Sequence, residues 1–144
     1  MPLTDILFID KVVRDILLDM IPDPRYIITV ERDLKQSVGQ RLAAIEHVTA
    51  TPEKSVISIG GLDDLLPKRS LGNEHVTYEG EFNIGVYAPT ESALKLIVNR
   101  LDGVFTHSDI TSNSIVAINI NNFADVLYDH NAYSIQLAMT CILQ

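Results

Sequence analysis

The sequence has almost no cysteine, because Cys141 is the single one among 144 residues. A disulfide framework within one chain is therefore excluded, and the fold must depend on burial and hydrogen bonds. A lone cysteine also fits a reducing, cytosolic compartment. We expect Cys141 to be a small buried apolar residue near the end of a strand.

Long uncharged hydrophobic runs are also missing. Acidic and basic side chains interrupt the first twenty residues from Asp5 to Asp19, so neither a signal peptide nor a membrane span fits there. No other stretch approaches eighteen uncharged apolar residues. We expect a soluble chain that is not exported by the usual signal and has no membrane partner.

Basic residues are few and scattered. The chain has 11 Lys and Arg against 19 Asp and Glu, which gives a net charge of −8, and Lys68 and Arg69 form the one adjacent basic pair. Nucleic-acid binders usually carry a basic face or stripe. Sequence-specific binding to nucleic acid is therefore not expected.

Motifs for metal binding and catalysis are absent as well. The four histidines do not follow HxH, HxxxH or HExxH spacing, and the acidic pairs Asp63–Asp64 and Asp125/Asp129 lack a third ligand at fixed spacing. Gly60–Gly61 lacks the spacing of a phosphate loop, and no GxSxG is present. We expect no catalytic residue, metal or cofactor, and we predict that the chain is not an enzyme. A triad whose members meet only in the fold stays open.

The chain does contain enough apolar residues, 47%, for one ordinary domain spanning residues 1–144. Apolar spacing of three and four predicts helices over residues 3–21, 33–45 and 91–105. Thr4 or Asp5 can cap the first helix, Pro22 and Pro24 end it, and Thr90 can cap the third.

Alternating or β-branched segments predict strands over residues 25–30, 55–60, 75–88, 114–120 and 132–143. The order of elements favours an α+β fold, with a mixed, largely antiparallel sheet and helices packed mainly on one face. We expect Phe82, Ile84 and Val86 to face the helix over residues 91–105.

Two connections remain, over residues 61–74 and 121–131. The first is predicted to be a long loop, although it carries four leucines: Leu62, Leu65, Leu66 and Leu71. Long loops of this kind are often functional, and apolar residues on them need something to pack against. The pattern therefore favours contacts between subunits.

The succession of these segments resembles the tail-terminator proteins of long-tailed phages, of the lambda type. The resemblance covers residues 55–143, while the helix over residues 3–21 also has a counterpart and residues 25–51 fit less well. The segments that carry it are SVISIGG, DDLLPKRSLGNE, HVTYEGEFNIGVYAP followed by TESALKLIVNRLDGVF, SIVAINI, NNFADVLYDHN and AYSIQLAMTCIL.

The resemblance implies a homo-hexameric ring that caps the tail tube, ends tail elongation and provides the surface to which the head joins. The implied partners are other copies of the chain, the tail tube protein, a head–tail neck or connector protein and, in a contractile tail, the sheath protein. The implied location is the tail or neck of the virion, assembled in the host cytoplasm. The residues predicted to contact subunits or the tube are Asp63, Asp64, Leu65, Leu66, Lys68, Arg69, Leu71, Glu79 and Glu81.

Two alternatives stay open at this point. The chain could be another neck or tail-completion protein of the same fold, because fold alone does not determine function. It could also be a small-molecule-binding α+β domain, with a hydrolase as a more distant third class. A stable monomer with a deep apolar pocket would favour the hypothesis of a small-molecule-binding domain over that of a ring-forming protein.

Overall fold

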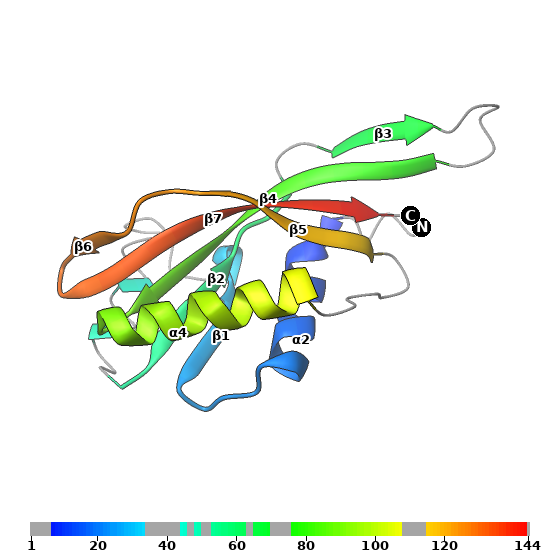
Figure 1. Ribbon diagram of the computed structural model, residues 1–144. Helices are drawn as coiled ribbons and strands as arrows, with labels where there is room; N and C mark the ends of the chain where they lie inside the picture. Colours follow the sequence, from blue (N-terminus) through cyan, green and yellow to red (C-terminus); the bar gives the residue numbers. More distant parts are fainter. Residues whose placement is uncertain are drawn as a thin grey trace.

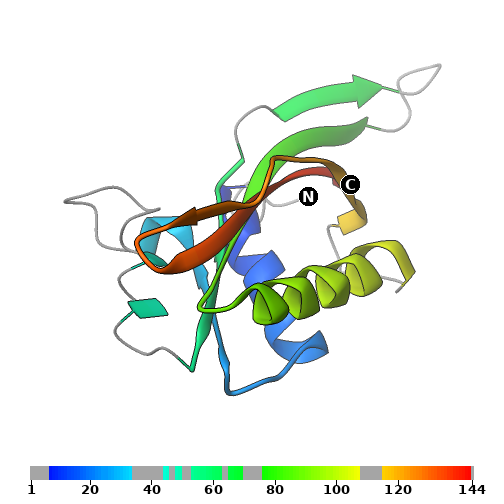
Figure 2. The ribbon, with the colours of Figure 1, turned by 60° about the vertical axis from the view of Figure 1, so that its left-hand side comes forward.

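The computed structural model describes residues 7–33, 44–45, 48–49, 53–62, 65–69, 76–107 and 115–143. Over these residues the predicted α+β class is confirmed, since a seven-stranded, mostly antiparallel sheet carries two α-helices (Figure 1). Both helices contribute to the same apolar core on one face of the sheet. Figure 2, turned by 60°, shows β4, β5 and β7 passing above α4.

Helix α2, Ile9–Met20, buries the apolar stripe Ile9, Val13 and Leu17 against the sheet. It ends just before Pro22, as predicted, and its proposed caps at residues 4 and 5 lie outside the described residues. The helix predicted over residues 33–45 also lies mostly outside them, and Asp33 itself belongs to the short 3-10 turn η1, Glu31–Asp33.

Helix α4, Glu91–Asp102, confirms the prediction from its apolar spacing. The Thr90 hydroxyl accepts a hydrogen bond from the Ala93 N–H at 3.1 Å, which satisfies one of the free donors at the start of the helix. The helix continues into a short π-helical segment, Gly103–His107.

The sheet has the strand order β1-β2-β4-β7-β5, with β3 beside β4 and β6 beside β7. Only the β1–β2 pair is parallel among the described strand pairs. The strands are β1 Tyr26–Val30, β2 Ser55–Ile59, β3 Leu65–Arg69, β4 Val76–Ala88, β5 Ile115–Phe123, β6 Leu127–Asp129 and β7 Ala132–Leu143.

The main core lies between the helices and the two long central strands, β4 and β7, which pair from Tyr78↔Leu143 to Ala88↔Tyr133. Their alternation confirms the predicted packing, because Phe82, Ile84 and Val86 share a buried cluster with Leu94, Ile97 and Leu101 of α4. Cys141 is buried in the same cluster, as expected.

A second, smaller cluster lies on the opposite face at one end of the sheet. Val56 and Tyr87 stand opposite each other on β2 and β4, and both belong to it, while their neighbours Ile57 and Val86 belong to the main core. Its other buried members are Ala44, Ile45, Val48 and Ala132. The sheet is therefore covered mainly, though not solely, on one face.

The sequence predicted residues 61–74 and 121–131 to be connections outside the strands, and both predictions are wrong in part. Within residues 61–74, residues 65–69 form β3, which pairs with the first part of β4 and tolerates Pro67 because it is an edge strand. Within residues 121–131, β5 continues to Phe123 and β6 pairs with the start of β7. In both places, pairing with a neighbouring strand stabilises a strand that the local sequence does not predict.

The turn between β6 and β7 has a specific geometry. His130 and Asn131 both have positive φ angles, 50° and 63°, and they separate Asp129 from its partner Ala132. Two consecutive residues of this kind match the right-handed twist of a two-residue hairpin. The turn therefore fixes the register of β6 on β7.

Candidate assembly surface

The predicted contact residues fall on one hairpin as far as they are described. Leu65, Leu66, Lys68 and Arg69 lie in β3, and Glu79 and Glu81 lie in β4. Asp63, Asp64 and Leu71 lie outside the described residues. Figure 1 shows β3 and the adjoining part of β4 projecting from one end of the sheet.

The register brings part of this set together. Leu66 stands directly opposite Glu79, and directly opposed residues share a face of the sheet. Glu81 is on the same face by alternation, opposite Thr140, and is exposed. Because Phe82 points into the helix-covered core, this is the face turned away from α2 and α4. Leu66, Glu79 and Glu81 therefore form an acidic face with one exposed leucine.

An exposed apolar segment lies at the other end of the sheet, where the sequence predicted only an acidic connection. Phe123 is 69% exposed, and Val126, Leu127 and Tyr128 are each more than half exposed. These four residues are called the hairpin patch below. Leu127 is opposite Ser134 and Tyr128 is opposite Tyr133, so these two side chains point to opposite faces and the patch extends over both faces at β6. The Tyr128 ring packs against the ring of Tyr133 with centroids 4.6 Å apart, which fixes one edge of the patch.

A surface groove of about 540 Å³ adjoins the hairpin patch. It runs between α4 and β7, and Val126 belongs to both groove and patch. Its rim carries an ion pair between the Lys95 ammonium and the Glu91 carboxylate, 3.1 Å apart. The apolar residues that line it are Leu94, Val98, Val126, Tyr133 and Ile135.

A second exposed apolar site precedes α2. Leu7 is more than half exposed and Phe8 is 42% exposed. The Lys11 ammonium lies 5.5 Å and the Arg32 guanidinium 5.0 Å from the centroid of the Phe8 ring, both within cation–π range. Leu7, Phe8, Lys11 and Arg32 are called the α2 patch below.

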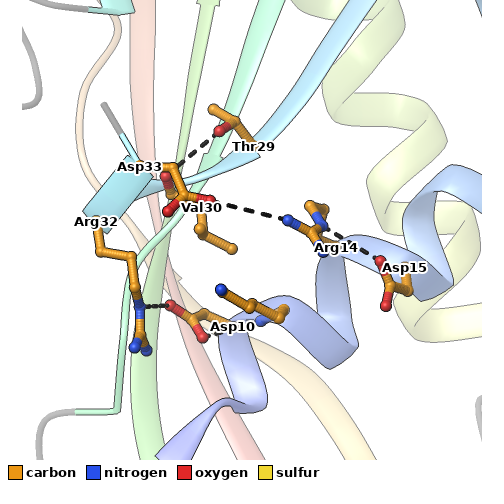
Figure 3. Close-up of polar contacts among 8 residues, drawn as sticks. Asp10, Arg14, Asp15, Thr29, Val30, Arg32 and Asp33 are labelled. Atoms are coloured by element: carbon orange, nitrogen blue, oxygen red, sulfur yellow. Dashed lines mark hydrogen bonds and ion pairs between the residues drawn. The ribbon is translucent and has the colours of Figure 1, made fainter. Parts of the chain in front are cut away.

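An ion pair with the buried carboxylate of Asp10 holds the exposed side chain of Arg32 in this position (Figure 3). Its Nε donates to Oδ2 of Asp10 at 2.7 Å, and its Nη2 donates to the Leu7 carbonyl at 3.2 Å. Asp10 is 1% exposed, so its carboxylate depends on this partner and on the Lys11 N–H, which donates at 2.9 Å. The pair therefore ties η1 to the first turn of α2.

A second ion cluster joins the start of β1 to the end of α4. Asp23 accepts hydrogen bonds from the backbone and side chain of Arg25, and one from Nη1 of Arg100 at 3.1 Å. The hydrogen bonds from Arg25, with a smaller contribution from Arg100, hold the pKa of Asp23 well below its ordinary value. The Arg100 guanidinium also lies 5.4 Å from the Tyr26 ring centroid. This cluster holds the two elements together.

The described residues contain no group of three or more His, Cys, Asp or Glu side chains placed to hold a metal ion. Burial raises the pKa of the Cys141 thiol to about 11, which leaves little thiolate at neutral pH. Within the described part of the chain, no helix has the length and apolar character that crossing a bilayer requires.

Leu66, Glu79 and Glu81 were named from the sequence as contact residues, which stays a prediction, and the apolar patches and the two ion clusters were not named. One signal was available, because residues 121–131 contain four large apolar side chains among polar ones. The same feature marked residues 61–74 as a contact segment. The ion clusters join residues far apart in the sequence, so local spacing carried no sign of them.

No protein-family model matches the chain, and no curated protein matches it. Among solved structures, the chain is similar to a chain of the "Virion of native gene transfer agent (GTA) particle", with 10% sequence identity and a TM-score of 0.49. The similarity covers 95% of this chain and 90% of that chain. A similarity of this degree assigns no function to the chain.

Proposed function

We propose that this chain is a structural protein of a phage-type virion that works by assembling with copies of itself into a ring. The observation that carries the proposal is the pair of exposed apolar patches, one beside α2 and one at the β6–β7 hairpin. Groups of large, exposed apolar side chains often mark a surface that binds another molecule.

The position of the patches supports a ring. Figure 1 places β6 at one end of the sheet and α2 towards the other, and the two patches differ in their residues. Contacts between unlike patches are head to tail, and they close into a ring when the rotation between copies permits. A two-fold dimer would need one patch that fits itself.

The finer proposal is a tail terminator: a hexamer that caps the tail tube, ends its growth and presents the head-joining surface. It is supported by the sequence resemblance over residues 55–143 and by the sheet, in which β4, α4, β5 and β7 follow in the expected order. We assign contact with the tube or neck proteins to the acidic face of Leu66, Glu79 and Glu81.

The experiment removes the protein from an assembling particle and images the tails by electron microscopy. Over-long tubes, or complete tails without heads, are expected. Restoring the intact chain should return tails to normal length and restore their heads. Normal tails joined to heads in its absence would contradict the proposal.

The groove beside α4 favours one alternative, a small-molecule-binding domain. Its volume of about 540 Å³ and its apolar lining are within the usual range of ligand sites. This alternative predicts a monomer that binds an apolar probe dye in the groove, and a Val98→Trp variant that loses the dye. The ring proposal predicts an oligomer instead.

A further inference from the structure

We infer that the α2 patch of one copy docks on the hairpin patch of the next copy. This assignment rests on the proposed self-assembly and specifies its contact. The hairpin patch consists of Phe123, Val126, Leu127 and Tyr128, and the α2 patch consists of Leu7, Phe8, Lys11 and Arg32.

The charges of the two patches are complementary. Two exposed acids, Asp125 and Asp129, are interspersed with the apolar residues of the hairpin patch. Lys11 and Arg32 both lie over the exposed Phe8 ring of the α2 patch. The charge of Arg32 is offset by its ion pair with buried Asp10, so Lys11 supplies the net positive charge of the patch. In a chain of net charge −8, random encounters between copies are repulsive. A cationic apolar patch facing an acidic apolar patch selects one orientation.

The side chains are also those that bind well at interfaces. Phe8, Phe123 and Tyr128 are exposed aromatic residues, and Arg32 is held in place by Asp10 before any partner arrives. Aromatic residues and arginine are enriched at the centres of interfaces, and fixed side chains lose less entropy on binding. The groove beside Val126 gives a docking side chain a recess to enter.

Two other modes of self-association fit less well. The hairpin patch paired with itself would bring Asp125 and Asp129 near their own copies, which is repulsive. Pairing through the open edges of β3 and β5 is hindered, because β3 contains Pro67 and β5 has two register shifts. Contact through side chains of the two patches remains the best match.

The test uses two variants, each of which lacks one patch. Phe8→Ser removes the aromatic of the α2 patch. The double variant Phe123→Ser with Leu127→Ser removes two of the four apolar side chains of the hairpin patch, one on each face of the sheet. Light scattering should find an oligomer for the wild type and a monomer for each variant alone. The exposed positions of these side chains should leave thermal unfolding close to wild type, which is measured in parallel.

Mixing the two variants gives the decisive result. Phe8→Ser keeps an intact hairpin patch, and the double variant keeps an intact α2 patch, so one good contact remains between them. The mixture should form a heterodimer and nothing larger. The matched control is Leu96→Ser, which removes an exposed leucine on the other flank of α4 and should leave the oligomer unchanged.

Charge exchange gives an independent readout. Lys11→Glu should weaken association about tenfold, and adding Asp125→Lys to the same chain should recover most of that loss. If the second change gives no recovery, the assigned charge pairing is wrong.

Three results would overturn the inference: a wild-type monomer at every concentration, patch variants that assemble like the wild type, or mixed variants that stay monomeric. If oligomers persist in both patch variants, the contact between the two patches is wrong, but self-assembly itself is not contradicted. The proposed virion role would then still be judged separately, by tail length in particles without the protein.

Discussion

Asp10 is the one charged side chain among the fully buried residues that the structure describes, and its ion pair with Arg32 is asymmetric. Arg32 is 39% exposed and can return to water, whereas Asp10 cannot. Arg32→Ala should therefore cost about 3 kcal/mol, because it leaves a buried carboxylate unpaired. Asp10→Asn should cost about 1 kcal/mol. Urea unfolding of both variants measures the difference, and equal losses would contradict the assigned asymmetry.

Asp23 should make stability depend on acid pH. Its pKa is lower in the folded protein than its ordinary 3.8, because Arg25 and Arg100 donate to its carboxylate. The stabilisation is therefore fully present above about pH 5 and is lost as the pH falls through 3.8 towards the folded pKa. Thermal unfolding between pH 5 and pH 2 should be less pH-dependent in Asp23→Asn than in the wild type. Identical slopes would show that the cluster contributes nothing.

Ile97 tests the packing of α4 on the central strands. It is buried among Phe82, Ile84 and Val86, so Ile97→Ala should cost about 2–5 kcal/mol. Leu96→Ala, at an exposed position of the same helix, should stay within about 0.5 kcal/mol and controls for helix propensity. Chemical denaturation measures both, and a loss below about 1 kcal/mol for Ile97→Ala would mean that the helix packs elsewhere.

At the scale of elements, the β6–β7 turn predicts how the hairpin patch is held. Val is β-branched and tolerates positive φ poorly, so Asn131→Val should cost about 1–2 kcal/mol and loosen β6. Asn131→Gly keeps the turn and serves as the control, although it loses the weak 3.4 Å contact with the Tyr128 hydroxyl. Hydrogen exchange at Leu127 and Asp129 should speed up in the Val variant alone. The same rate in both variants would show that the turn does not hold the strand.

The sequence predicted well those elements whose own residues show the apolar spacing of a strand or a helix. Strands β4 and β7 alternate over most of their length, and α2 and α4 repeat apolar residues every three or four positions. β3 and β6 were missed because they are short and acquire order by pairing with β4 and β7, the strands that follow them in the chain. Their stabilisation comes from pairing, which local propensity does not report.

The candidate surface also contains residues that local spacing predicts and residues that only the fold brings together. Leu66, Glu79 and Glu81 were predicted as contact residues from the sequence, and the register of β3 on β4 then places Leu66 opposite Glu79. Phe123 and Tyr128 were missed because their exposure depends on the fold of β5 and β6 rather than on spacing. Lys11 and Arg32 lie far apart in the sequence, and only the fold brings them to one aromatic ring.

At the scale of the whole molecule, the ring proposal predicts a discrete mass. Native mass spectrometry should find six copies of the 16.0 kDa chain, with little of any intermediate size once the ring has closed. Closing the ring satisfies both patches of every subunit, whereas an open chain leaves one patch exposed at each end. A broad ladder of sizes would indicate an open filament, and a single two-copy species would indicate a two-fold dimer.

The central place of β7 has a consequence for how the protein is made. The strand is the latest of the described elements to leave the ribosome, yet β4, β5 and β6 all pair with it. Until it emerges, β4, β5 and β6 lack the strand that joins them, and the two helices cover an unfinished sheet. We expect the nascent chain to stay open until translation has passed residue 143. A prematurely terminated chain would then lack a formed hairpin patch and be left out of the assembly.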